Sequence, residues 1–115
     1  MPSTCAFCRI VAGQEDANVI HQDEELTAFH DQHPQAPVHV LIVPNRHIRS
    51  VNETTQDDVL WLGEMVLLAH QLAQELEIAE SGYRLIINTG REGGQSIGHL
   101  HLHLLGGRQM RWPPG

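Results

Sequence analysis

The chain has 115 residues, a formal net charge of −7 and no lysine, so it lacks the basic face of a general nucleic-acid-binding protein. This length suffices for one domain, which we assign to residues 1–115. No apolar run approaches the roughly 18–20 residues that cross a bilayer. Residues 1–10 lack the basic and apolar regions of a signal peptide. We therefore expect a cytoplasmic protein that does not bind membranes.

The first half of the chain alternates between apolar segments and turn-forming segments. The spacing of apolar residues predicts a short helix over 4–12 and a hairpin with strands at 19–22 and 26–30. Two prolines make 31–37 a loop, because proline prevents regular strand pairing. Residues 38–43 then predict a mostly apolar strand.

The second half begins with the longest predicted element. Thr55 and Asp58 resemble a capping box, and apolar residues recur at helical spacing from there to about Glu80. Strands are predicted at 83–88 and 99–105. The whole pattern predicts an α+β fold, with an antiparallel sheet of about five strands, one short N-terminal helix and one long helix.

Three histidines alternate with leucines in the last predicted strand. His99, His101 and His103 should share one face at intervals of about 6.5–7 Å, while the leucines face the core. Imidazole near neutral pH can act as a nucleophile, a proton donor or a metal ligand. The alternation alone therefore leaves a catalytic row, a metal-binding stripe and a plain polar face all open.

A glycine-rich loop, residues 88–96, ends three residues before the first of these histidines. Its glycines allow backbone amides to approach an anion closely. Asn88, Gln95 and Ser96 add polar side chains. A hairpin connection also uses glycine, but the position beside three histidines favours a phosphate-binding loop.

Gly-Gly-Gln-Ser, His-Leu-His-Leu-His-Leu-Leu-Gly-Gly-Arg and the terminal Trp-Pro-Pro-Gly together resemble the nucleotide-binding branch of the histidine triad proteins, HINT. The resemblance continues upstream through Ala28-Phe29-His30-Asp31, Pro34-Gln35-Ala36-Pro37-Val38-His39 and Ile42-Val43-Pro44. It departs at Gly13-Gln14-Glu15-Asp16, where the family commonly has Gly-Glu-Ile-Pro.

The resemblance implies a purine nucleoside 5′-phosphoramidase, in which His101 attacks the α-phosphorus and forms a nucleotidyl-imidazole intermediate. His103 and His39 then contact phosphate oxygens and assist protonation of the leaving group, and Ser96 hydrogen-bonds the leaving amine. The remaining contacts that the resemblance implies are Asp31 on the ribose, Phe29 and Ile20 around the base, and Asn88, Gly94 and Gln95 around ribose and phosphate.

Cys5 and Cys8 form the only Cys-x-x-Cys pair. In a cytosolic protein this spacing is more typical of metal binding or redox activity than of a structural disulfide, and the two thiolates need further ligands to complete a zinc site. Resemblance to the wider histidine triad superfamily implies that His47 and His99 complete a structural Zn²⁺ site. The alternative is that both cysteines simply pack on the first helix.

Two other activities remain open. One is a dinucleoside polyphosphate hydrolase or nucleotidyl transferase of the same superfamily, and the other is a non-catalytic nucleotide-binding module. The resemblance also implies a homodimer, a nucleoside monophosphate or phosphoramidate as ligand, no organic cofactor, and a C-terminal tail (108–115) that docks near the active site of the partner subunit.

Overall fold

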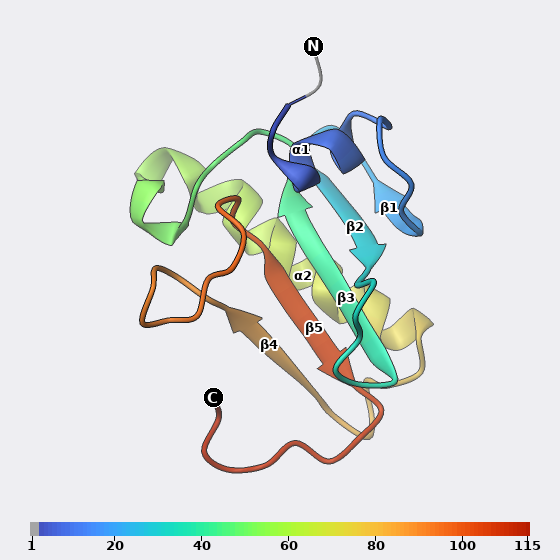
Figure 1. The fold of residues 1–115 in the computed structure, drawn as a ribbon. Helices are drawn as coiled ribbons and strands as arrows, with labels where there is room; N and C mark the ends of the chain where they lie inside the picture. Colours follow the sequence, from blue (N-terminus) through green and yellow to red (C-terminus); the bar gives the residue numbers. More distant parts are fainter. Residues whose placement is uncertain (1–2) are drawn as a thin grey trace.

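The computed structural model describes residues 3–115, so the first two residues of the predicted domain lie outside the described part of the chain. It confirms the predicted α+β architecture of five antiparallel strands with one short and one long helix (Figure 1). The elements are α1 (Ala6–Val11), β1 (Val19–Gln22), β2 (Leu26–His30), β3 (Val38–Pro44), α2 (Val59–Glu75), β4 (Tyr83–Ile87) and β5 (Leu102–Gly106).

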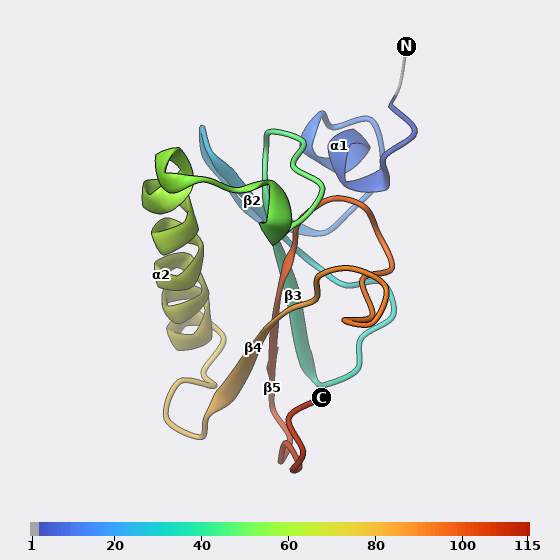
Figure 2. The ribbon, with the colours of Figure 1, turned by 90° about the vertical axis from the view of Figure 1, so that its left-hand side faces the viewer.

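The five strands form a single sheet in the order β1-β2-β3-β5-β4, which places β4 at one edge. The sheet separates the two helices: α2 lies along one face and α1 lies against the other, near one end (Figure 2). Alternating side chains along each strand therefore face either α2 or α1.

No helix among residues 3–115 combines the length and the apolar character needed to cross a bilayer.

The main core lies between α2 and the sheet. Val40 and Ile42 of β3 and Leu102 and Leu104 of β5 are almost completely buried and face this helix. The leucines of the histidine-leucine alternation therefore occupy the core, as their pattern predicts. The buried residues of α2 are Trp61, Met65, Leu68, Ala69, Leu72 and Ala73.

Helix α2 begins later and ends earlier than its apolar spacing predicts. The predicted capping box is present, but it starts a 3-10 turn (Gln56–Asp58), and α2 follows at Val59. At the other end, Glu77 adopts a positive φ of 61°. The amides of Glu77 and Ile78 donate to the carbonyls of Gln74 and Ala73, a Schellman ending. Because glutamate rather than glycine occupies this position, the end of the helix before Glu80 could not be predicted from residue type.

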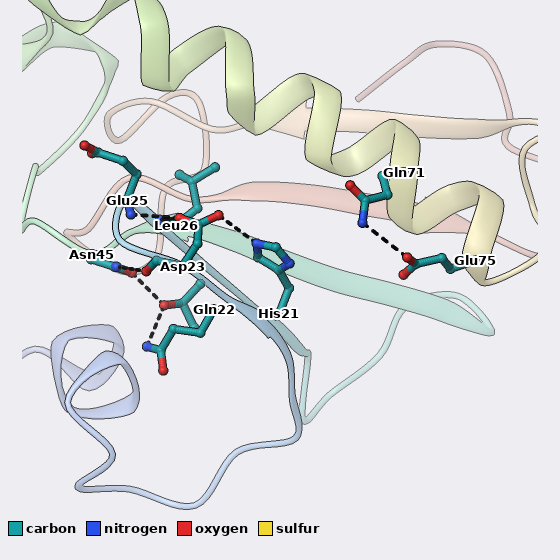
Figure 3. A network of polar contacts seen from close by, with 9 residues as sticks. His21, Gln22, Asp23, Glu25, Leu26, Asn45, Gln71 and Glu75 are labelled. Carbon is teal, nitrogen blue, oxygen red and sulfur yellow. Dashed lines mark hydrogen bonds and ion pairs between the residues drawn. The ribbon is translucent and has the colours of Figure 1, made fainter.

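The β1–β2 hairpin is held by its turn (Figure 3). The Asp23 carboxylate accepts from the backbone amides of Glu25 and Leu26 at 2.8 and 2.9 Å, and it also pairs with the His21 ring. In β1 the register shifts between Val19 and His21, because a bulge interrupts the pairing with β2. The residue within this irregularity, Ile20, packs against the core beneath α2.

Candidate active site

A pocket lies between α1 and the sheet face opposite α2. Its floor is a row across three neighbouring strands, since Phe29 pairs with Leu41 and Leu41 pairs with His103. Apolar side chains line most of the pocket, and a few polar ones converge on it. The lining includes Phe7, Ile10, Ala17, Phe29, Leu41 and Ile97 among the apolar residues, and Glu15, Asp31, Ser96, His101 and His103 among the polar ones.

His101 is buried, and its orientation is set by the chain just before it. Its Nδ1 lies 2.8 Å from the carbonyl oxygen of His99. A carbonyl can only accept, so the neutral ring carries its proton on Nδ1 and leaves a lone pair on Nε2. The ring also packs edge-on against Phe7, with centroids 5.1 Å apart. His101 therefore presents an unprotonated nitrogen without having to lose a proton first.

His39 and His103 form a second chain of hydrogen bonds that also starts from the backbone. The amide of Gln35 donates to Nδ1 of His39 at 3.0 Å, which places the proton of the neutral His39 ring on Nε2. This Nε2–H lies 2.9 Å from Nδ1 of His103, which must accept. Nε2 of His103 then carries a proton. The neighbouring rings of His101 and His103, 4.9 Å apart, thus present one acceptor and one donor.

Burial and neighbouring charge keep this second pair neutral. Burial, followed by the electrostatic repulsion that protonated His103 would meet from His101 and His39, lowers the pKa of His103 from 6.5 to about 4, although Asp31 partly opposes the shift. Burial also lowers the pKa of His39, with Asp31 opposing. Both rings are therefore neutral near pH 7, as the hydrogen-bond chain requires.

Asp31 stands beside the histidine pair at the end of β2. One carboxylate oxygen accepts from the backbone amide of His33 at 2.8 Å, and the other lies 3.4 Å from Nε2 of His39. Ligand atoms of Asp31, His39 and His103 all lie within 4.8 Å of one another. However, the Gln35 amide keeps the His39 proton on Nε2, the nitrogen that a shared metal would need. The three residues therefore form a polar cluster, with a hydrogen bond between the two histidines, rather than a metal site.

The glycine-rich loop brings Ser96 into the pocket, but its other predicted contact residues brace the loop itself. The Asn88 side chain donates to the carbonyl of Gly93 at 2.7 Å. The Gln95 side chain donates to the carbonyls of Arg49 and Ile97 and accepts from the amide of Gly90. The predicted contacts of Asn88, Gly94 and Gln95 with ribose and phosphate remain predictions.

Ile20, one of the two predicted base contacts, does not line this pocket. The bulge in β1 turns its side chain to the α2 face of the sheet, so Phe29 is the predicted base contact that lines the pocket. Ile10, Ala17 and Ile97 also line it and were not predicted as site residues. The three-residue spacing of Phe7 and Ile10 on a helix was a signal that both share one face.

The last predicted strand also differs, because it begins at Leu102 rather than His99. His99 lies in the approach to β5 and turns its ring toward α1. Its Nδ1 lies 3.3 Å from the Cys5 sulfur, 3.5 Å from the Cys8 sulfur and 3.2 Å from Nδ1 of His47. The three histidines therefore do not form one evenly spaced row: two line the pocket, and the first belongs to a separate cluster.

This cluster of Cys5, Cys8, His47 and His99 has the dimensions of a tetrahedral metal site. A zinc ion with Zn–S of about 2.3 Å and Zn–N of about 2.0–2.1 Å separates its ligand atoms by roughly 3.3–3.8 Å. The distances above, and the 3.2 Å between the Cys8 sulfur and Nδ1 of His47, lie within this range or just below it. Nε2–H of His99 donates to the carbonyl of Pro44 at 2.9 Å, which leaves the Nδ1 lone pair facing the other three.

The lowered pKa of His103 predicts a specific pH dependence of stability. The unfolded chain takes up a proton near pH 6.5, whereas the folded chain does so only near pH 4. The free energy of unfolding must therefore fall as the pH decreases between these values. We expect wild type to lose about 1–3 kcal/mol more than His103→Gln between pH 7 and 4.5 in urea titrations. The exposed His70→Gln should behave as wild type, and parallel profiles for wild type and His103→Gln would contradict the assignment.

Known proteins resemble this chain over nearly its whole length. The family model described as HIT domain matches residues 12–110. A purine nucleoside phosphoramidase of Escherichia coli strain K12 is 44% identical over 110 residues, which cover 96% of this chain and 92% of that protein.

Solved structures of histidine triad proteins also resemble this chain over most of its length. A HIT family hydrolase from Legionella pneumophila has a TM-score of 0.95 at 47% identity and covers 97% of this chain and 100% of its own. A Zn-bound histidine triad family protein from Mycobacterium smegmatis has a TM-score of 0.79 at 29% identity, covering 91% of this chain and 76% of its own. With a family match over most of its residues and a relative at 44% identity, this chain belongs to the HIT domain family.

Proposed function

We propose that this protein is a purine nucleoside 5′-phosphoramidase that hydrolyses a P–N bond through a nucleotidyl intermediate on His101. One observation carries the proposal. The His99 carbonyl holds the proton of His101 on Nδ1, so that Nε2 of this pocket-lining ring keeps a lone pair for attack on a substrate. The similarity to a protein named purine nucleoside phosphoramidase supports the same reaction.

The reaction proceeds by two displacements at phosphorus. In the first, Nε2 of His101 forms a bond to phosphorus while the leaving nitrogen takes up a proton from a donor in the pocket; the P–N bond breaks and the neutral amine departs. In the second, water attacks the phosphorus and the bond to Nε2 breaks, which releases the nucleoside monophosphate. Overall, one water molecule supplies the hydroxyl group on phosphorus and the hydrogen on the amine. The covalent route replaces one difficult step with two easier ones.

Donors around His101 stabilise the charge that spreads over the phosphoryl oxygens. Nε2–H of His103 is the donor beside the nucleophile, and the hydroxyl of Ser96 lines the same pocket and serves the departing nitrogen. Because His39 is fixed by the Gln35 amide, the His103 donor is oriented before the substrate arrives. Donors that are already in place cost no reorganisation in the transition state.

The rest of the pocket suits a purine nucleoside. Phe29, Leu41 and Ile10 supply an apolar slot for the base, and the partly exposed carboxylate of Asp31 stands where ribose hydroxyls can donate to it. A plain acceptor is the right partner for two hydroxyl groups, since an ionised carboxylate cannot donate.

The role of His101 can be tested by single-turnover hydrolysis of adenosine 5′-phosphoramidate. We expect His101→Ala to reduce the rate by about 10³-fold or more, because no other group replaces the nucleophile. AMP binding, measured by calorimetry, should survive. Glu24→Ala, also a change to alanine but at an exposed position in the β1–β2 turn, should keep the wild-type rate.

Equal turnover by wild type and His101→Ala would remove His101 from this role. Binding of AMP without turnover in wild type would instead favour a nucleotide-binding module. Faster cleavage of a dinucleoside polyphosphate than of the phosphoramidate would favour the superfamily's polyphosphate hydrolases.

We also propose that Cys5, Cys8, His47 and His99 hold one Zn²⁺ ion. Such a closed set of four ligands serves structure and leaves no open position for catalysis. It ties α1 to the segment that leads into β5, and so fixes both sides of the pocket. The sulfurs of Cys5 and Cys8 lie 3.2–3.5 Å from imidazole nitrogens, a convergence that simple core packing does not explain. The Zn-bound relative from Mycobacterium smegmatis is consistent with the proposal.

Metal content tests this site without any assay of activity. Protein purified without chelators should contain about one zinc ion per chain, and Cys8→Ser should contain little, because three ligands bind zinc far more weakly than four. Thermal unfolding should shift downward when zinc is removed from wild type and much less in the Cys8→Ser variant. Zinc-free wild type, or equal zinc in both proteins, would contradict the site.

We further propose that the protein forms a homodimer through β4 and the outer face of α2. Strand β4 is an edge strand, and Val59, Leu60, Val66 and Leu67 leave an apolar stripe exposed on α2. In this proposal a second copy covers both. Trp112 in the tail is 86% exposed, and the tail is held to β4 by Arg84, which donates to the carbonyls of Arg111 and Pro114. From there the tail can reach the pocket of the partner subunit.

Sedimentation equilibrium should give about twice the chain mass of 12.9 kDa. Leu67→Asp should shift the protein toward the monomer, since it places a charge within the apolar stripe. Glu92→Gln, a change in the exposed glycine-rich loop, should leave the dimer intact. A monomeric wild type at micromolar concentration would contradict the proposal.

A further inference from the structure

We propose that Glu15 selects the purine base, and that the protein prefers guanine to adenine through this carboxylate. The inference rests on the proposed function, because it assigns a specificity residue to the same pocket. Glu15 is one of two acidic side chains among its lining residues, and the other, Asp31, stands beside His39 and His103. Glu15 takes no part in the proposed reaction at phosphorus.

Successive residues of α1 and of the turn that follows it form one wall of the pocket, which leads from His101 toward Glu15. Phe7, near the start of α1, packs against the ring of His101 with centroids 5.1 Å apart. Ile10 follows one turn later on the same helix face. Gly13, with φ of +74°, then turns the chain, and Glu15 follows. A nucleotide whose phosphorus lies at His101 therefore extends along apolar side chains, with its base in the direction of this carboxylate.

One neighbour orients the Glu15 carboxylate, and its oxygens can still accept hydrogen bonds from a ligand. Oε2 accepts from Nε of Arg9 at 2.7 Å, and Arg9 is itself held by a bond from its guanidinium to the carbonyl of Ser3 at 2.8 Å. Within residues 3–115, Arg9 is the only hydrogen-bond partner given by the structure for this side chain. A carboxylate has about four lone-pair positions, so both oxygens can accept further donors.

An ionised carboxylate discriminates between the two purines because it can only accept. Guanine presents two adjacent donors on its Watson–Crick edge, N1–H and the N2 amine, which match the two oxygens of Glu15. Adenine presents the N6 amine beside N1, which is an acceptor and faces the carboxylate unfavourably. A paired, charge-assisted contact of this kind distinguishes bases more strongly than apolar packing does.

The alternative is an ion pair between Glu15 and Arg9 that serves only the loop. The side chains of Glu15 and Arg9 are 41% and 28% exposed, and such pairs contribute little to stability. That alternative predicts that a change at Glu15 alters both purine substrates equally. Base selection predicts instead that the ratio between them changes.

The test compares guanosine and adenosine 5′-phosphoramidates, with GMP and AMP binding measured in parallel by calorimetry. We expect wild type to favour guanosine by roughly 5- to 30-fold in kcat/KM, a modest ratio because the site is partly exposed. Glu15→Gln should abolish or reverse this preference, since an amide can donate to N1 of adenine while accepting from N6. The change should fall on KM and Kd rather than on kcat, because the contact lies away from phosphorus.

Two controls separate this inference from the proposed function. Glu24→Gln, an exposed glutamate in the β1–β2 turn, should keep the wild-type ratio. Inosine 5′-phosphoramidate, which retains N1–H but lacks the N2 amine, should fall between guanosine and adenosine. A GMP-to-AMP ratio near one in wild type, or one unchanged by Glu15→Gln, would overturn the inference. Because binding decides it, absence of turnover would count against the phosphoramidase proposal alone.

Discussion

The carbonyl oxygen of His99 lies 2.8 Å from Nδ1 of His101, and the chemistry of the pocket depends on this contact. Without it the imidazole could carry its proton on either nitrogen, and the form with a free Nε2 would be only one of two. His99 is itself held in place on both sides, since its ring donates to the carbonyl of Pro44 and faces Cys5, Cys8 and His47. His99 thus links the Cys5–Cys8–His47 cluster, through its ring, to the proposed nucleophile, through its main-chain carbonyl.

The backbone also makes neighbouring histidines chemically different. The Gln35 amide sets His39, and His39 sets His103, so His103 presents a donor next to the acceptor of His101. Burial lowers the pKa of His103 to about 4 and so keeps this ring neutral. In the proposed reaction, two imidazoles of equal intrinsic character therefore take the roles of nucleophile and oxyanion donor side by side. The fold supplies the difference through one carbonyl and one amide.

The sequence could predict the parts of this arrangement that depend on side-chain pattern. Alternation of histidine and leucine predicted the buried leucines of β5, and the resemblance to histidine triad proteins pointed to several residues that line the pocket, His101 and His103 among them. It could not predict features set by backbone geometry. The αL residue Glu77 ends α2, the bulge in β1 turns Ile20 away, and Gln35 acts through its amide, which any residue except proline supplies. Glu15 belongs to the pocket only because the turn after α1 brings it there.

The ring nitrogens of His101 and His103 can be observed directly by ¹⁵N NMR of imidazole-labelled protein, and this measurement tests the central claim most closely. At pH 7 we expect His101 to be protonated on Nδ1 with an unprotonated Nε2, and His103 to show the opposite arrangement. His103 should remain neutral at this pH, because burial lowers its pKa to about 4. A proton on Nε2 of His101, or the same tautomer in both rings, would contradict the account.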